Sequence, residues 1–434
     1  MSVAIVITIS LLILFTLLAT GQYVGAAVGL TALLLLHFMV GPGKELLAII
    51  TPWSTLNNFV LLALPGFILM GNIIMHSGLG SRLYRGISPW VSRLPGGLLH
   101  TNIASCAAFG AICGSSVATA ATIGTMAIPE QTKLGYDKTF ILGTLAGAGT
   151  LGLMIPPSIS LIVYAALTGE SIGRLFIGGI IPGVMLAALF MSYTAIKSIQ
   201  QPDLVPPATA TPSLKELALS LRNLWPVVAL LVGVIGSIYF GVATIIEAAA
   251  LGVVGAAILA AVHRQFGWQV IRRSLSEAVR TTVMINFIVI GALVLQFAWG
   301  NLAVPRQLAS AITGLGLSRW VVLAFIYLIY LGLGCLFDGI SMMVLTLPII
   351  FPLILSLGFN PVWFGVTLTL LIEIAQITPP VGLNLYVLSG MAKAPIMQVV
   401  RGAIPFFFLL LVGLILITVF PSLITWLPGT MMGK

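Results

Sequence analysis

Small polar residues and prolines interrupt this apolar chain at points where backbone and side-chain oxygens could hold a cation. Gly114-Ser115-Ser116 break one apolar stretch, and Pro156-Pro157 and Thr378-Pro379-Pro380 break two others. Proline removes an amide donor and leaves a helix carbonyl unpaired, so each break offers neutral oxygen ligands beside hydroxyl groups. Such ligands suit a hard monovalent cation such as sodium, and half-helix N-termini beside them suit an anionic group. The alternative is that the small residues only let helices pack closely.

Three of the ten acidic residues, Glu247, Asp338 and Glu373, lie in apolar surroundings, and the other seven are expected in loops. An ionised side chain at the centre of a membrane helix costs roughly 2.5 to 3.5 kcal/mol, so each should face a cavity or a partner. Glu247 lies near a helix start within capping distance of Thr244, which favours a structural role. Asp338 at the middle of an interrupted stretch favours a functional role. For Glu373, five residues before Thr378, both interpretations stay open.

The interruptions recur at one constant offset. Residues 129 to 182 reappear in outline at 352 to 405, so that each breaker has a counterpart 223 residues later (352 − 129 = 223). The corresponding pairs are Pro129 and Pro352, Gly135 and Gly358, Pro156-Pro157 and Pro379-Pro380, and Pro182 and Pro405. A pattern of interrupted helices has therefore been duplicated. In an apolar chain, interruptions at matching positions of two halves indicate the binding site of a secondary transporter.

Composition predicts an all-α integral membrane protein. The 434 residues are 59% hydrophobic and 7% charged, whereas a soluble domain carries about 25% charged residues. Helices of about 20 apolar residues cross a hydrocarbon core of about 30 Å. We expect nearly continuous crossings at about 3–20, 22–40, 53–76, 139–168, 175–197, 225–241, 243–262, 282–300, 362–390 and 402–426.

Two further apolar stretches, at about 98–128 and 320–354, are broken near their middles by small or polar residues. We interpret each as a re-entrant helical hairpin, because an irregular tip must sit in protein or line a watery cavity rather than face lipid. Within the spans at 139–168 and 362–390, the proline pairs predict one broken transmembrane helix in each half.

Charge then orients the chain. With both hairpins returning to their own side, 14 of the 19 Lys and Arg residues lie on one face, and 19 − 14 = 5 remain on the other: Lys44, Arg174, Arg306, Arg319 and Lys434. The positive-inside rule makes the first face cytoplasmic and places the N-terminus in the periplasm. The first hairpin then enters from the cytoplasm and the second from the opposite side. We therefore expect two inverted-topology repeats, at 1–200 and 224–434, joined by a proline-rich cytoplasmic linker at 201–223.

Several functions fit the sequence poorly. The net charge of +9 follows from the loop bias and favours anionic lipid headgroups, and the basic residues are too scattered for nucleic-acid binding. The three cysteines give neither a disulfide framework nor a metal spacing. Gly41-Pro42-Gly43-Lys44 is followed by Glu45 where a phosphate loop needs Ser or Thr. We expect no cofactor, with sodium serving as a coupling ion.

Three segments resemble the signatures of the large membrane subunit of TRAP transporters, the tripartite ATP-independent periplasmic carriers. They are Cys113 to Gly124 (CGSSVATAATIG), Gly149 to Ser158 (GTLGLMIPPS) and Ile377 to Leu385 (ITPPVGLNL). The resemblance covers almost the whole chain. It departs from the family pattern at Cys113, where Ser is usual, and at Ala375-Gln376, where a Gly is common.

The resemblance implies an elevator in the bacterial inner membrane, in which a transport domain of hairpins and broken helices slides against a scaffold. It implies sodium-driven uptake of a small organic acid, such as a C4-dicarboxylate or sialic acid, delivered by a periplasmic binding protein, and a small four-helix membrane subunit as partner. It assigns one sodium site to Ser115, Gly152, Ile155 and Pro157, and another to the region of Asp338, Gly339 and Thr378. Residues expected to support these sites or the substrate cavity are Gly114, Ser116, Pro156, Ser341, Glu373, Pro379 and Asn384.

Two alternatives compete with this interpretation. The nearest is a stand-alone sodium and anion symporter of the ion-transporter superfamily, which would work without a binding protein. The other is a membrane-embedded enzyme, which fits poorly because Asp338 has no second Asp in a matching motif and Ser115 has no His near it in sequence. We expect no enzymatic activity and assign the four histidines to interfaces or packing: His37, His76, His100 and His263.

Overall fold

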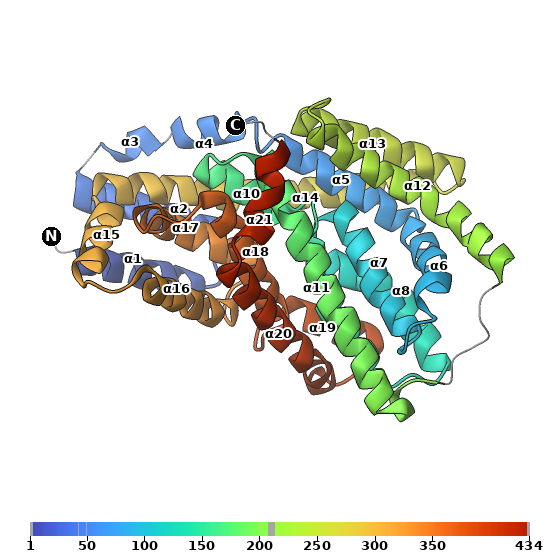
Figure 1. Cartoon of the computed structure of the whole chain (residues 1–434). Coiled ribbons are helices and arrows are strands. Elements are labelled where there is room, and N and C mark those ends of the chain that lie inside the picture. Colours follow the sequence, from blue (N-terminus) through green and yellow to red (C-terminus); the bar gives the residue numbers. More distant parts are fainter. Residues whose placement is uncertain (1–2, 42, 49, 207–212, 432–434) are drawn as a thin grey trace.

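The computed structural model describes residues 3–41, 43–48, 50–206 and 213–431 (Figure 1). Every regular element among them is a helix, which confirms the all-α fold class. Pro42, Lys434 and residues 207–212 of the expected linker lie outside the described residues. In Figure 1, α1, α2, α16 and α17 lie toward one end of the molecule, and α6, α8, α12 and α13 lie toward the other.

The helices of the first half end with the long α11. They are α1 (Val3–Ala19), α2 (Val24–Leu35), the π-helix η1 (Leu36–Val40), α3 (Glu45–Ala48), α4 (Ile50–Leu56), α5 (Ala63–His76), α6 (Leu79–Val91), α7 (Leu98–Cys113), α8 (Ser116–Lys133), α9 (Lys138–Met154), α10 (Ile159–Thr168) and α11 (Ile172–Gln200).

A short 3-10 helix, η2 (Pro202–Leu204), precedes the second half. The remaining helices are α12 (Leu214–Tyr239), α13 (Ile245–Val262), α14 (Trp268–Asn301), α15 (Val304–Gly314), α16 (Arg319–Gly334), α17 (Gly339–Ser356), α18 (Pro361–Gln376), α19 (Leu383–Ala392), α20 (Ile396–Val419) and α21 (Ser422–Met431). Residues 214–223 of the expected linker are therefore helical, because Ser213 and Glu216 form a capping box that starts α12.

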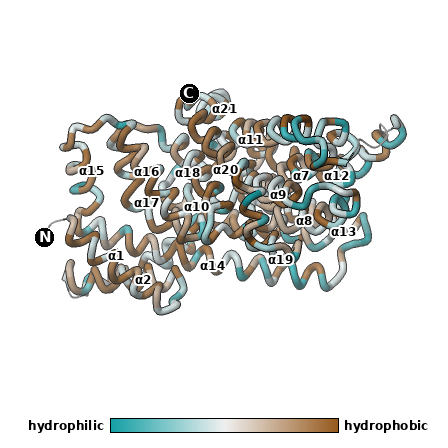
Figure 2. The backbone as a smooth tube through the Cα atoms, turned by 90° about the horizontal axis from the view of Figure 1, so that it is seen from below, coloured by the Kyte–Doolittle hydropathy of each residue, from teal (hydrophilic) through white to brown (hydrophobic). Residues whose placement is uncertain are grey.

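The chain is a multi-span membrane protein. Among the described residues, seven helices are long and apolar enough to cross a membrane, or eight if the bent pair α5 and α6 is one span. Figure 2 shows hydrophobic residues predominating along α1, α16, α17 and α20. Large apolar side chains also lie on the outside of the helices, for example Val232 and Ile258, as expected for surfaces that face lipid.

Three expected crossings differ from the observed helices. The span at 53–76 is interrupted between α4 and α5 by a turn in which Asn58 Oδ1 accepts a hydrogen bond of 2.8 Å from Val60 N. Asparagine stabilises such turns through its side chain. The span at 282–300 is part of the longer α14, and the span at 402–426 ends at Val419 before Pro421.

Helix boundaries and packing repeat with the sequence offset. The pairs α7–α8 and α16–α17 are joined by short turns, and α8 and α17 have 18 residues each, starting 223 residues apart (339 − 116 = 223). The peptide bonds Pro156-Pro157 and Pro379-Pro380 are both cis. In the first half Gly143 packs on Gly402 of α20, and its counterpart Val366 packs on Gly178 of α11. The duplicated breakers therefore occupy duplicated packing environments.

Candidate functional site

The turn between α7 and α8 packs directly on the break between α9 and α10. Ser115 caps α8, with Oγ accepting from Ala118 N at 3.4 Å. Gly114 has φ +60, and a Cβ there would lie 2.7 Å from the Pro157 carbonyl oxygen. A Cβ on Gly152 would lie 2.8 Å from the Ser115 carbonyl oxygen. The structure thus brings together four predicted site residues, and two of them must be glycine for the backbones to meet.

The first break places the end of one helix beside the start of another. Ile155 leaves α9 in an extended conformation, and its side chain packs against Gly183 of α11. After the buried Pro156-Pro157 pair, Ser158 caps α10. The amide of Ile159 donates to the Gly114 carbonyl at 3.5 Å. Carbonyls at the end of α9 and amides at the start of α10 therefore converge, which suits a cation beside an anionic group.

The turn between α16 and α17 lies against α18, just before the second break. Asp338 caps α17 by accepting from Ser341 N at 3.2 Å. Gly339 packs on Ile372, and a Cβ on Gly334 would lie 2.7 Å from the Ala375 Cβ. Thr378 Oγ1 donates to the Ile374 carbonyl at 2.6 Å. The three residues assigned to the second site thus come from two neighbouring elements.

Sequence inspection did not pair the two caps, although the offset links them. Ser115 corresponds to Asp338, and Ala118 corresponds to Ser341 (338 − 115 = 341 − 118 = 223). In both halves the capping oxygen accepts from the third residue of the following helix. The hairpin tips are therefore the same local structure, once neutral and once acidic.

Asn384 connects the two halves at the first tip. It lies on α19, and its Nδ2 donates to Ser116 Oγ at 2.7 Å and to the Ala146 carbonyl at 3.3 Å. Its side chain is fully buried, and Oδ1 has no hydrogen-bond partner within the described part of the chain. This contact joins residues 268 positions apart. One face of the first site therefore comes from the second half.

Glu373 is buried in α18 without a protein partner. Its exposed fraction is 0%, and neither carboxylate oxygen has a hydrogen-bond partner among the described residues. One turn earlier, Thr369 Oγ1 lies 3.4 Å from Ser160 Oγ, which lies 2.9 Å from Ser158 Oγ next to the first break. An unpaired buried carboxylate is costly, so this group needs either a proton or a cation. The supporting role remains a prediction.

Glu247 takes the structural role that its position predicts. It forms a capping box with Thr244, whose backbone N donates to Glu247 Oε2 at 2.7 Å. The functional interpretation of Asp338 gains a structural counterpart, because the same carboxylate is also a helix cap.

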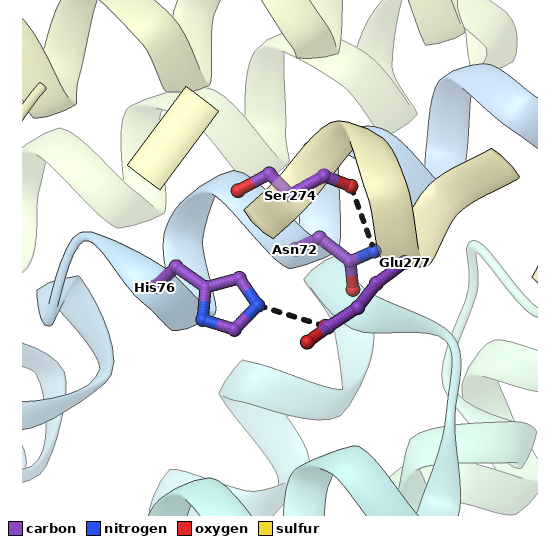
Figure 3. Close-up of polar contacts among 4 residues, drawn as sticks. All are labelled: Asn72, His76, Ser274 and Glu277. Carbon is purple, nitrogen blue, oxygen red and sulfur yellow. Dashed lines mark hydrogen bonds and ion pairs between the residues drawn. The ribbon is translucent and has the colours of Figure 1, made fainter. Parts of the chain in front are cut away.

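A separate polar junction joins α5 to α14 (Figure 3). His76 Nε2 lies 2.8 Å from Glu277 Oε2, and Asn72 Nδ2 donates to the Ser274 carbonyl at 3.3 Å. His76 is thus an interface residue, as expected. Glu277 was expected in a loop and lies instead within α14, because that helix, at about 1.5 Å per residue, extends well beyond a 30 Å membrane core.

Apolar spanning helices, with two helical hairpins packed against two broken helices, define a polytopic α-helical membrane protein of the transporter kind. A model of the family described as "Tripartite ATP-independent periplasmic transporter, DctM component" matches residues 11–423. The chain belongs to this family of large permease components, which confirms the resemblance seen in its motifs.

Individual relatives agree. The chain is 36% identical to the C4-dicarboxylate TRAP transporter large permease protein DctM of Pseudomonas aeruginosa, over 87% of this chain and 88% of that one. It is 32% identical to the sialic acid TRAP transporter large permease protein SiaM of Vibrio cholerae, over the same shares. The structure also resembles the Alcanivorax borkumensis YdaH transporter, with a TM-score of 0.56 and 16% identity over 87% of this chain and 90% of that one. This last likeness concerns the fold alone. Family membership does not favour the stand-alone symporter.

Proposed function

We propose that this protein is the membrane-spanning permease of a sodium-driven uptake system for a small organic acid, such as a C4-dicarboxylate or sialic acid. The observation that carries the proposal is the duplicated site, in which a hairpin tip meets a broken helix twice in one chain of the DctM family. Broken helices at matching positions are the ion and substrate sites of secondary transporters.

Each duplicated break supplies one sodium site in this proposal. Ser115, Gly152, Ile155 and Pro157 form the first, and Asp338, Gly339 and Thr378 form the second. If two sodium ions enter with a monoanion, one net positive charge crosses the membrane. The membrane potential then supplies about 2.3 kcal/mol per 100 mV to uptake.

The permease would work as an elevator in the bacterial inner membrane. The hairpins and broken helices, α7–α10 and α16–α19, would form the transport domain, and the other long helices would form the scaffold. A periplasmic binding protein would deliver the acid, and a small four-helix subunit would complete the membrane part. We place the N-terminus in the periplasm and treat 1–200 and 224–434 as inverted repeats, with 201–223 between them. No enzymatic step is proposed.

Uptake into proteoliposomes tests the proposal. Vesicles that hold the chain and its small subunit should accumulate labelled acid only when sodium is higher outside and the binding protein is present. An inside-negative potential should speed uptake. Equal uptake with a proton gradient and no sodium would refute sodium coupling, and undiminished uptake without the binding protein would favour the stand-alone symporter.

Cysteine labelling tests the inverted topology. Cys113 adjoins the first tip and is buried, whereas Cys335 adjoins the second tip and is half-buried. After Cys106 is replaced by alanine, an impermeant thiol reagent should reach Cys335 from the periplasmic side only. It should reach Cys113 more slowly and from the cytoplasmic side only. Labelling of both from one side would contradict inversion.

A further inference from the structure

A charged cavity lies where α6, α12 and α13 meet, away from both broken helices. Its volume is about 520 Å³, and its lining includes Arg82 of α6, Arg222 and Asn223 of α12, and His263 at the end of α13. No acidic side chain is part of this lining. Within the described ranges, neither guanidinium has a hydrogen-bond or ion-pair partner. The cavity therefore holds uncompensated positive charge and calls for an anion.

The protein holds these groups in place without a ligand. Trp90 Nε1 of α6 donates to Ser220 Oγ of α12 at 2.8 Å, and Gly86 lets α6 approach Leu224. His263 Nδ1 donates to the Leu259 carbonyl at 2.7 Å, which leaves Nε2 for another partner. Because the helices are already packed together, an anion would meet a preformed site.

Helix lengths place the cavity at one boundary of the membrane. The 26 residues of α12 extend for about 39 Å and the 18 residues of α13 for about 27 Å, against a hydrocarbon core of about 30 Å. The two helices are joined by the short segment 240–244. Counting 17 residues back from Tyr239 reaches Arg222, and counting 17 forward from Ile245 reaches Val262. Arg222 and His263 therefore lie at the same depth.

Apolar stripes lead from the cavity toward the centre of the membrane. On α12, Trp225, Val228 and Val232 are 61%, 45% and 65% exposed. On α13, Val262 and Ile258 are 71% and 56% exposed. Trp225 and Val262 also line the cavity, so each stripe begins at the charged site. A soluble anion would use only the charges, whereas a phospholipid would use the charges and both stripes.

We propose that this cavity binds the phosphate headgroup of an anionic phospholipid, with its acyl chains along α12 and α13. The bound lipid would hold α6 against these two helices. Since α6 directly precedes the first hairpin, the lipid would fix the base from which that hairpin extends. This inference does not depend on the proposed transport activity.

Native mass spectrometry of the full-length chain, with phosphatidylglycerol or phosphatidylcholine added in detergent, tests the site. The unchanged chain should bind phosphatidylglycerol at least tenfold more tightly than phosphatidylcholine. Arg82→Gln with Arg222→Gln should abolish this preference. The control is Arg272→Gln with Arg273→Gln, which removes the same charge from exposed positions at the start of α14, and it should keep the preference. Equal loss in both pairs, or no loss in the first, would overturn the proposal.

Two further measurements distinguish a bound lipid from a soluble anion and locate its acyl chains. Millimolar inorganic phosphate should not displace phosphatidylglycerol, and complete displacement would assign the site to a soluble anion instead. Phosphatidylglycerol with brominated chains should quench tryptophan fluorescence, and the conservative Trp225→Phe variant should lose part of that quenching. Identical quenching in both proteins would show that the chains do not follow α12, even if the arginine variants fail to fold.

Discussion

The two hairpin tips are the same local structure in different surroundings. Gly152 faces the first tip, and its counterpart at the second is Ala375 (375 − 152 = 223), which packs on Gly334. The proline pair of the first break is buried, whereas Pro379 and Pro380 are exposed. The first tip is therefore closed and capped by a neutral serine, and the second is more open and capped by an aspartate.

This difference shows what duplication preserves and what it leaves free. Backbone breakers remain in register, since they determine where helices end. Single side chains then set how closely a tip meets its break and how much charge it carries. A closed neutral cage and an open charged one are two ways to hold the same cation, because a nearby carboxylate compensates for fewer oxygen contacts.

Adding one methyl group to the closed site should have the largest effect. In Gly152→Ala the new Cβ would lie 2.6 Å from Thr119 Oγ1 and 2.8 Å from the Ser115 carbonyl oxygen. Overpacking of this kind costs about 1 to 3 kcal/mol, so sodium-driven uptake should fall about ten- to hundredfold. The measurement is the initial rate in proteoliposomes at equal protein content.

The matched control is Ala375→Gly, which gives the second half the glycine of the first. It removes a methyl group from a less enclosed position, so uptake should change less than about threefold. Equal losses in the two variants would show that the tips do not differ in closeness.

Removing a hydroxyl from either break should have the next largest effect. Ser115→Ala and Thr378→Ala each remove one candidate ligand and leave its partners unpaired, at a cost of roughly 1 to 3 kcal/mol. The sodium concentration for half-maximal uptake should rise tenfold or more. Thr378→Ser keeps the hydroxyl and should behave like the unchanged chain.

Stability separates the two positions. Ser115 also caps α8, so Ser115→Ala should lower thermal stability by about 1 kcal/mol. Thr378 donates only to its own helix, and Thr378→Ala should not. Unchanged sodium dependence in both alanine variants would mean that these residues only pack.

Local signals explain why much of this site could be predicted from sequence. Pro156-Pro157, Thr378 and the Gly114-Ser115 turn act on their own backbone, so residue type alone shows where the helices stop. The cation-ligand assignment came from family resemblance, and the fold adds only that the first group of residues converges.

Other features depend on contacts between distant segments. Asn384 reaches Ser116 across 268 residues, and nothing in either segment announces the partner. The burial of Glu373 without a partner likewise depends on packing around α18. Even a local error had a physical cause, because the side-chain turn at Asn58 ends a span that hydrophobicity alone would continue.

Removing the charge of the second tip should have a smaller effect. Asn is as good a helix cap as Asp, so Asp338→Asn keeps α17 but deletes a negative charge. We expect about a fivefold rise in the sodium concentration for half-maximal uptake, since the group is only half-buried and partly screened. The control Ser115→Thr retains both cap and charge at the first tip. If Asp338→Asn leaves sodium dependence unchanged, the charge difference between the tips has no role in cation binding.

The smallest effect should come from the junction in Figure 3, which lies outside both tips. His76 and Glu277 have side chains that are 18% and 46% exposed, and such ion pairs contribute about 0.2 to 1 kcal/mol. Glu277→Gln should therefore lower the unfolding temperature only slightly and leave the sodium concentration for half-maximal uptake within about twofold. A double-mutant cycle with His76→Ala measures the coupling. The pair has no counterpart in the other half, where the corresponding positions hold Trp299 and Ser54 (76 + 223 = 299; 277 − 223 = 54). A tenfold change in sodium dependence from this unduplicated contact would show that cation affinity is not set at the duplicated tips.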